Sequence, residues 1–323
     1  MHFSHFFLPL QRIMKQLVTI IVCLLLLAAC GQSYEETKRI ARENRREAEL
    51  RDVAALKIAV LPTLDCLPLF VAQHYHLYDT LNGGVRLKYF TAQMDCDTAM
   101  LRGRVEGCVT DLVRAKCMER QGLKLRYSAA TNAYWQLISN RNARVRQLKQ
   151  LEDKMVAMTR YSATDYLTDR VVDSVKLQDE HVFRVQINDL SVRMLMLQNN
   201  EMDALWLTEP HATAARNMKH HAVMDSRNLG VQLGVLAFRE KEMRRQGRSQ
   251  QYQLFIQAYN QACDSINKYG IAHFRNLIID KCSVKGETVD SLPKTIRFQH
   301  TRGPREQDVK IVEQWLNKVK GKK

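Results

Sequence analysis

Short apolar runs separated by polar loops recur from residue 56 onward. Residues 56–61 form a buried-strand run, and apolar positions at 68–75 have helical spacing. Residues 85–90 then alternate as a half-buried strand, and a helix and a turn lead to another strand at 107–111. Strands that alternate with helices predict α/β layers.

The same order of elements begins again in the second part of the chain. The closest match joins residues 100–111 with residues 197–209. Each segment contains a helix end, a tight turn, an acidic residue, a small residue, a strand, and finally threonine with an acid, at Thr110-Asp111 and Thr208-Glu209. A repeat of roughly a hundred residues predicts two similar α/β lobes. Chance similarity between two common strand–helix units is the alternative.

Polar loops follow the predicted strands of both lobes. If the carboxyl ends of the strands face one another, these loops line a cleft. The segment "DALWLTEPHATAA" (203–215) enters such a corner, where Pro210 suits the first turn of a helix with Thr208 or Glu209 as its cap. We predict that Thr208-Glu209 and Thr110-Asp111 line opposite walls of one cleft.

The first residues are typical of a secretory signal. From Met14, the predicted start, a basic residue, an apolar stretch and small residues precede Cys30. The apolar run is short for a membrane-spanning helix. Leu-Ala-Ala-Cys resembles a bacterial lipobox, which implies removal of residues 1–29 and lipid attachment to Cys30. Cleavage elsewhere, with Cys30 as one more apolar residue, is the alternative.

Residues 30–56 are expected to form a charged tether between this anchor and the lobes. The segment lacks an apolar stripe until its end, and pairs such as Glu43 with Arg46 and Arg45 with Glu49 favour partial helicity.

The net charge of +15 falls to +13 when residues 1–29, which contain Arg12 and Lys15, are removed. This charge is spread along the chain, and no nucleic-acid-binding motif is present, so we expect no nucleic-acid partner.

Six cysteines follow the signal, and export permits disulfides. The pair Cys263 and Cys282 and the pair Cys66 and Cys96 are candidates, and free buried thiols are the alternative. No cysteine or histidine spacing suggests a metal site, and we expect no cofactor.

Four segments in order resemble the solute-binding lipoproteins of ABC importers, within the branch that handles nitrate, sulfonates and thiamine-pyrimidine precursors. They are "LKIAVLPTLDCLPLFVAQHYHLYDTL", "GRVEGCVTDLVRA", "LEDKMVAMTRYSATDYL" and "LQNNEMDALWLTEPHATAA". The resemblance implies a type II periplasmic-binding-protein fold with a ligand between two lobes. It places lobe 1 at 57–136 and 233–323, lobe 2 at 137–232, and the crossings near Trp135–Ser139 and Gly230–Val235. The first loop, "PTLDCLP", departs from the glycine-rich family pattern and leaves the ligand open.

Individual side chains give conflicting indications of the ligand. Ser162 and Thr164 open a helix whose N–H groups suit an anion or a polar head group, with Arg160 nearby, although an ordinary cap explains them equally well. Asp65 and Asp111 argue against a simple oxyanion and favour an amine-bearing or mixed-charge heterocycle. Tyr134, Trp135 and Tyr161 offer stacking faces or pack in the core. The candidate ligand-binding residues are Thr63, Asp65, Gln93, Thr110, Asp111, Trp135, Arg160, Tyr161, Ser162, Thr164, Asn188, Thr208, Glu209 and His211.

The sequence therefore predicts a non-catalytic, monomeric, membrane-anchored component of an ABC importer. It would capture a small polar ligand by lobe closure in the periplasm or extracellular space and present it to the permease and ATPase subunits. One alternative is an enzyme acting on a small heterocycle, with His211 and either Asp111 or Glu209 as acid and base. A second is a surface interaction lipoprotein without a deep cleft.

Overall fold

The computed structural model describes residues 20, 34–80, 84–245 and 247–320. The predicted start at Met14, the signal cleavage site and the lipidated Cys30 lie outside these residues. The chain divides into two units, residues 1–54 and 55–323. In the first unit, α2 (Tyr34–Ala54) has no buried residue and carries ion pairs between Arg45 and Glu49 (3.2 Å) and between Arg39 and Glu43 (3.9 Å). Residues 34–54 of the charged segment thus form one helix, in which Glu43 pairs with Arg39 rather than with Arg46.

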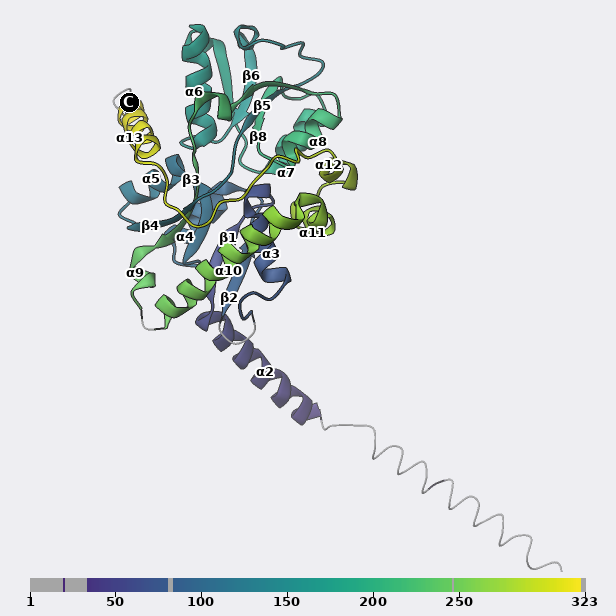
Figure 1. The fold of residues 1–323 in the computed structure, drawn as a ribbon, viewed down its shortest axis with the longest axis vertical. Helices are drawn as coiled ribbons and strands as arrows, with labels where there is room; N and C mark the ends of the chain where they lie inside the picture. The colour runs from purple at the N-terminus through teal and green to yellow at the C-terminus, as the bar shows by residue number, and fades with distance from the viewer. Residues whose placement is uncertain (1–19, 21–33, 81–83, 246, 321–323) are drawn as a thin grey trace, which may run out of the picture. The chain divides into compact units, whose positions relative to one another are not determined.

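The second unit contains two five-stranded sheets with equivalent strand orders. Figure 1 shows β1–β4 in one part of this unit and β5, β6 and β8 in the other. The first sheet, in the order β2-β1-β3-β10-β4, comprises β1 (Leu56–Val60), β2 (Val85–Tyr89), β3 (Gly107–Asp111), β4 (Leu125–Ala130) and β10 (Gly234–Arg239). The second, in the order β7-β6-β8-β5-β9, comprises β5 (Gln136–Ser139), β6 (Lys154–Met158), β7 (Val182–Gln186), β8 (Ala204–Leu207) and β9 (His221–Asp225). The fourth strand in each order runs antiparallel to both of its neighbours. This equivalence confirms the two predicted α/β lobes.

Helices follow the parallel strands in both lobes. In the first lobe, α3 (Leu67–His74), α4 (Gln93–Leu101) and α5 (Leu112–Arg120) follow β1, β2 and β3. In the second, α6 (Ala163–Val175), α7 (Leu190–Gln198) and α8 (His211–Asn217) follow β6, β7 and β8. The remaining helices are α9 (Glu240–Met243), α10 (Arg248–Tyr269), α11 (Arg275–Cys282), α12 (Gly286–Asp290) and α13 (Glu306–Lys320). The strands and the helix predicted between residues 56 and 90 are therefore present as β1, α3 and β2.

The chain passes between the sheets at residues 131–135 and 226–233. Gly234 begins β10 just after the second crossing. A Cβ atom at Gly234 would lie 2.2 Å from Thr131 Oγ1 and 2.6 Å from Ala133 Cβ, both of which belong to the first crossing. Only glycine lets the two crossings approach this closely.

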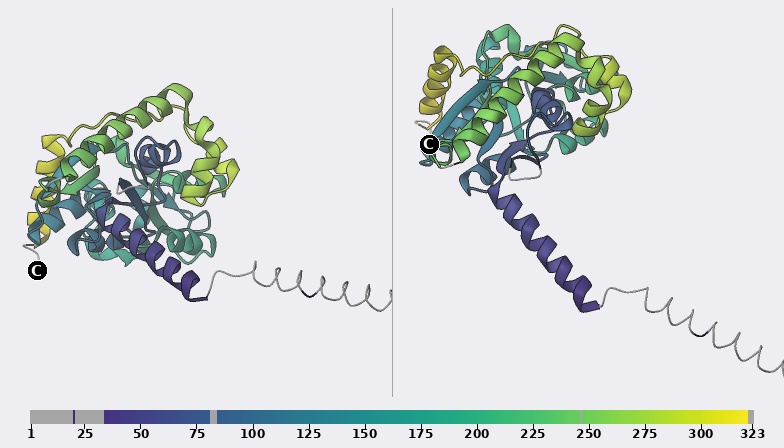
Figure 2. Two further views of the ribbon diagram at one scale, coloured as in Figure 1. Left: turned by 90° about the horizontal axis from the view of Figure 1, so that it is seen from below. Right: turned by 60° about the horizontal axis from the view of Figure 1, so that its bottom comes forward.

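Separate apolar cores stabilise the lobes. The long helix α10 lies along the first lobe (Figures 1 and 2). Its Phe255 packs against Phe238 of β10, with ring centroids 5.5 Å apart. Another cluster, around Leu197 and Leu205, lies within the second lobe.

A further core is shared between the lobes. It contains Leu112 of α5, Leu167 of α6 and Leu316 of α13. The Trp315 indole N–H of α13 donates a hydrogen bond of 2.6 Å to Asp169 of α6, and Glu313 pairs with Lys116 of α5 at 2.9 Å. Helix α13 thus joins the two lobes along one side.

The proposed disulfide partners are free thiols in the structure, so neither expected pairing is formed. Cys66, Cys263 and Cys282 are buried in the core beneath α10, whereas Cys96 lies in a different apolar cluster. The Cys263 thiol instead contacts the Gln299 carbonyl oxygen at 3.4 Å. The cysteines pack as small apolar side chains, which was the alternative interpretation.

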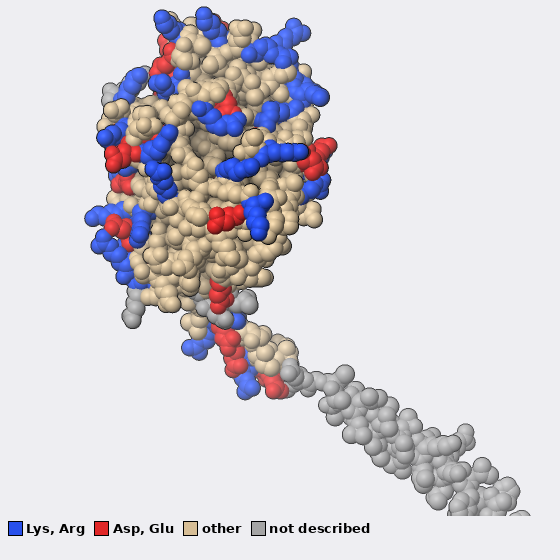
Figure 3. All heavy atoms as spheres, viewed as in Figure 1, with Lys and Arg blue, Asp and Glu red and all other residues tan. Residues whose placement is uncertain are grey.

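The described residues also bear on membrane spanning and on the distribution of surface charge. Within residues 34–80, 84–245 and 247–320, no helix is both long and apolar enough to cross a bilayer. Lys and Arg are scattered over both lobes on the face shown in Figure 3, with acidic side chains among them.

Candidate functional site

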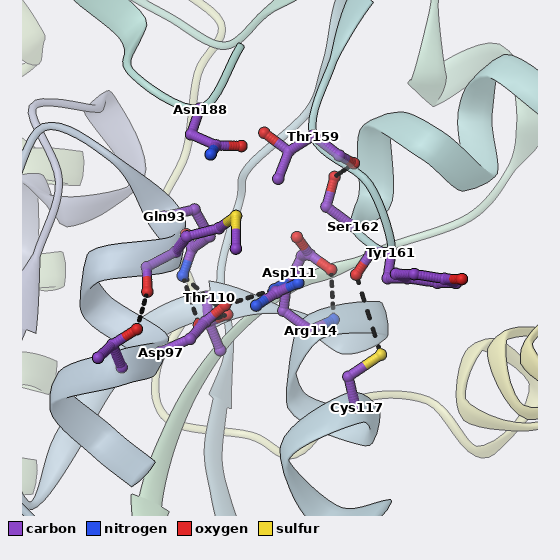
Figure 4. A network of polar contacts seen from close by, with 12 residues as sticks. Gln93, Asp97, Thr110, Asp111, Arg114, Cys117, Thr159, Tyr161, Ser162 and Asn188 are labelled. Carbon is purple, nitrogen blue, oxygen red and sulfur yellow. Dashed lines mark hydrogen bonds and ion pairs between the residues drawn. The ribbon is translucent and has the colours of Figure 1, made fainter. Parts of the chain in front are cut away.

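A narrow cavity of about 70 Å³ lies between the lobes, at the carboxyl ends of the parallel strands. We call it the cleft cavity. Its lining includes ten of the fourteen candidate ligand-binding residues: Thr63, Asp65, Gln93, Thr110, Asp111, Trp135, Ser162, Thr164, Asn188 and Thr208. Figure 4 shows Asn188, Thr159 and Ser162 of the second lobe facing Gln93, Thr110 and Asp111 of the first.

Two candidates next to the cavity do not line it. Arg160 is exposed, with its guanidinium 4.0 Å from Asp165. Tyr161 is half-buried, and its backbone N–H donates to Asp165 at 2.9 Å. Their carbonyl oxygens contact the first lobe instead: Arg114 donates to the Arg160 carbonyl at 3.3 Å, and the Cys117 thiol lies 4.0 Å from the Tyr161 carbonyl.

The Glu209 carboxylate is already occupied by contacts within the protein. Its carboxylate accepts from the Thr213 N–H at 2.9 Å and from the Tyr134 hydroxyl at 3.1 Å, and it pairs with Arg216 at 2.9 Å. Helix α8 begins at His211, so Pro210 itself occupies the N-cap position that was predicted for Thr208 or Glu209. Of the corner, only Thr208 lines the cleft cavity opposite Thr110 and Asp111.

His211 lines a different and larger cavity, of about 1290 Å³, formed by both lobes. Its imidazole is buried, and Nδ1 has no hydrogen-bond partner among the described residues. Burial lowers the pKa of His211 to about 4. Because Asp111 lines the cleft cavity and Glu209 is occupied, the structure does not assemble the acid–base pair required by the enzymatic alternative.

Asp111 ends β3 and caps α5 by accepting a hydrogen bond from the Arg114 N–H at 2.9 Å. The backbone N–H of Ala163, at the start of α6 in the opposite lobe, also acts on this carboxylate and lowers its pKa. Desolvation outweighs both contacts and raises the pKa of Asp111 to about 6. The Asp111 carboxylate thus lies in a desolvated position between the N-termini of α5 and α6.

A polar network supports the floor of the cleft cavity (Figure 4). Gln93 donates to Asp97 at 3.1 Å and to the Thr110 hydroxyl at 3.0 Å. The Arg114 guanidinium pairs with Asp97, which is 1% exposed, and so offsets part of the cost of burying its charge, although burial still raises the pKa of Asp97. The network fixes the Gln93 and Thr110 side chains beside Asp111.

Asp65 lies in the turn between β1 and α3. It is buried and accepts a hydrogen bond from the Thr131 hydroxyl at 3.0 Å. Desolvation raises the pKa of its carboxyl group. Neither Asp65 nor Asp111 forms an ion pair with a Lys, Arg or His side chain of the described residues. The charge of Arg114, which is itself paired with Asp97, lowers the pKa of Asp111 from further away, and the negative charge of Asp97 opposes this effect.

The hydroxyls of the second lobe mostly bond to one another. Ser162 accepts from the Thr164 N–H at 3.1 Å and donates to the Thr159 carbonyl at 2.7 Å. The Thr164 hydroxyl accepts from the Thr159 N–H at 2.9 Å. In contrast, the buried Thr208 hydroxyl has no hydrogen-bond partner among the described residues.

Arg193 is a lining residue that the sequence argument missed. It is buried in α7 and donates to the carbonyls of Ile187 and Trp206, each at 2.8 Å, and to the Thr159 hydroxyl at 2.7 Å. Burial lowers its pKa to about 10. The signal was an arginine among the apolar positions of "LSVRMLMLQ", where a buried cation needs several acceptors.

Hydrogen bonds join the two lobes near the cleft cavity. The Thr91 hydroxyl donates to Asp189, and the Leu190 N–H donates to the Thr91 carbonyl at 3.3 Å. Elsewhere around the cavity, the Leu64 N–H donates to the Glu209 carbonyl at 2.8 Å. The structure therefore shows the two lobes closed on each other.

No protein-family model matches the chain, and no curated protein sequence matches it. Among solved structures, the alkanesulfonate-binding protein SsuA from Xanthomonas axonopodis pv. citri, bound to MOPS, is similar with a TM-score of 0.70 and 14% identity, over 83% of this chain and 93% of that one. The nitrate-binding protein NrtA from Synechocystis PCC 6803 is similar with a TM-score of 0.63 and 11% identity, over 78% of this chain and 74% of that one.

A Candida albicans gene product described as having the generic periplasmic binding protein fold has a TM-score of 0.64 and 15% identity, over 83% of this chain and 90% of that one. Together with the matching strand orders and the closed cleft, these similarities confirm the predicted periplasmic-binding-protein fold.

Proposed function

We propose that the protein is the solute-binding component of an ABC importer and holds a small polar ligand between its lobes. The observation that carries the proposal is the cleft cavity, where polar side chains from the strand ends of both lobes meet near hydrogen bonds that join the lobes. The similar structures of a sulfonate-binding and a nitrate-binding protein support it.

Closure provides the mechanism. A ligand that contacts Thr110 or Asp111 on one wall and Thr208 on the other makes both sets of contacts only when the lobes are closed. Ligand binding therefore shifts the population toward the closed form in proportion to this difference in affinity. No bond is made or broken, and a permease need only distinguish closed from open molecules.

The amino-terminal segment supports a membrane location. Lipid on Cys30 would anchor the mature chain, and α2, which has no buried residue, would serve as a solvated spacer. The lobes would then work as a monomer in the periplasm or extracellular space and deliver the ligand to permease and ATPase subunits.

Ligand screening of the mature lipoprotein in detergent tests this proposal. Pyrimidines, sulfonates, nitrate and small amines are added separately, and thermal unfolding is followed together with small-angle X-ray scattering. A ligand with micromolar affinity at millimolar concentration adds about 4 kcal/mol of stability, and closure lowers the radius of gyration. Turnover of a compound without stabilisation or closure would support the enzymatic alternative.

A further inference from the structure

The buried acidic residues differ in how their charge is compensated. Seven Asp and Glu residues among those described are buried: Asp65, Asp97, Asp111, Asp165, Glu209, Glu242 and Asp308. Five of these form ion pairs with arginine: Asp97 with Arg114, Asp165 with Arg184, Glu209 with Arg216, Glu242 with Arg245, and Asp308 with Arg305. The two that lack such a partner, Asp65 and Asp111, are the two that line the cleft cavity.

A buried carboxylate without a counter-charge opposes folding, because desolvation of a charge costs several kcal/mol, of which hydrogen bonds recover one part and a paired cation a further part. This chain supplies arginine to its other buried acids. The missing partners of Asp65 and Asp111 therefore point to a positive group that comes from outside the chain.

A second observation on the opposite wall points the same way. Thr208 is 9% exposed and lines the cleft cavity, and its hydroxyl oxygen has no hydrogen-bond partner among the described residues. A hydroxyl can accept from an N–H donor. An ammonium, amidinium or guanidinium group could thus bind carboxylates on one lobe and this hydroxyl on the other.

Arg193 contributes a positive charge to the lining of the cleft cavity. Among the described residues, it is the one cation that lines the cleft cavity, and each of its three guanidinium nitrogens already donates to the second lobe. With Asp65 and Asp111 ionised, the lining carries one net negative charge. A monovalent cation neutralises it, whereas a sulfonate or nitrate would be placed beside two carboxylates.

We propose that the cleft cavity selects a small organic monocation with N–H donors and rejects oxyanions. The volume of about 70 Å³ corresponds to about five water-sized positions, which suits a cationic head group of a few atoms. This inference rests on the proposed function, because it names the ligand class of the same site.

The test uses the mature full-length lipoprotein and simple salts. Calorimetric titrations with methylammonium, guanidinium and acetamidinium chlorides are compared with sodium methanesulfonate and sodium nitrate at matched ionic strength. We expect saturable binding of at least one of these cations, no binding of either anion, and cation affinity that rises as pH increases through about 6, where Asp111 ionises.

Variants locate the binding. Asp65→Asn and Asp111→Asn each lower cation affinity at least tenfold, and Thr208→Val lowers it severalfold. Glu152→Gln, an exposed acid in the second lobe, leaves affinity unchanged. Urea unfolding of both Asn variants is the accompanying control, and we expect both to remain folded, so that lost binding is not a loss of structure.

The outcomes separate the two proposals. Failure of all three cations to bind, or cation binding that both Asn variants retain, overturns the inference. If methanesulfonate or nitrate then binds and closes the lobes, the solute-binding proposal stands while the cation inference fails. If no compound of the wider ligand screen binds either, both fail.

Discussion

Replacing Asp111 with asparagine should stabilise the protein at neutral pH. Asparagine keeps an oxygen that can accept the Arg114 N–H hydrogen bond at the start of α5, and it is as good a cap as aspartate. What it removes is a buried charge without an ion-pair partner. The change therefore isolates the cost of that charge.

The magnitude follows from the pKa of Asp111, which burial raises from 3.8 to about 6. Between these values the folded chain binds more protons than the unfolded chain, so this group stabilises the fold fully below pH 3.8 and its contribution is lost as pH rises through 6. A difference of about two pKa units corresponds to about 3 kcal/mol. Asp111→Asn should recover this amount at pH 7.5.

Urea unfolding at pH 3.5, 5.0 and 7.5 measures the effect. The stability gained by the variant should be largest at pH 7.5 and vanish at pH 3.5. Asp97→Asn is the matched control, because its carboxylate is compensated by Arg114, and this change should destabilise the protein. If Asp111→Asn is also less stable at pH 7.5, the carboxylate makes a favourable contact in the folded chain and the reasoning is wrong.

Three further changes test other parts of the structure. Burial lowers the pKa of His211 to about 4, so the wild-type protein should lose about 3 kcal/mol of stability in urea unfolding as pH falls from 6.5 to 4. His211→Gln should abolish this loss. If the variant shows the same dependence of stability on pH, another group causes the loss. Arg193→Met removes the donor to three buried acceptors and should lower the free energy of unfolding, measured with urea, by about 3 kcal/mol or more. An unchanged free energy of unfolding would mean that these acceptors find other donors. Gly234→Ala should lower the melting temperature, since its Cβ would lie 2.2 Å from Thr131 Oγ1. Gly303→Ala is the control, because a Cβ atom there would have no atom within 4 Å. Equal changes in melting temperature for the two variants would refute the steric explanation.

The sequence pattern predicted the lobes well because the relevant signals are local. The spacing of apolar residues predicts strands such as 56–60 and 85–89, and the end of each strand determines where the polar loop that follows it lies. Thr110, Asp111 and Thr208 could therefore be placed on facing walls before their contacts were known.

The hydrogen-bond and ion-pair partners of individual side chains could not be predicted from the sequence. Glu209 is bound by Tyr134, which is 75 residues away, and Arg193 reaches Thr159, which is 34 residues away. The same residue types at a strand end can bind a ligand or stabilise their own lobe. Only the three-dimensional pairing of charges shows that Glu209 is satisfied internally and that Asp65 and Asp111 are not.

Helix α13 has a consequence for how the chain reaches its final form. Its residues 306–320 follow both sheets in the sequence, yet its Trp315 and Leu316 belong to the core shared by α5 and α6. During synthesis or export from the amino terminus, each sheet can form before α13 emerges, but the seam between the lobes stays open to water until it docks. The last helix therefore sets the time at which the two halves become one cooperative folding unit.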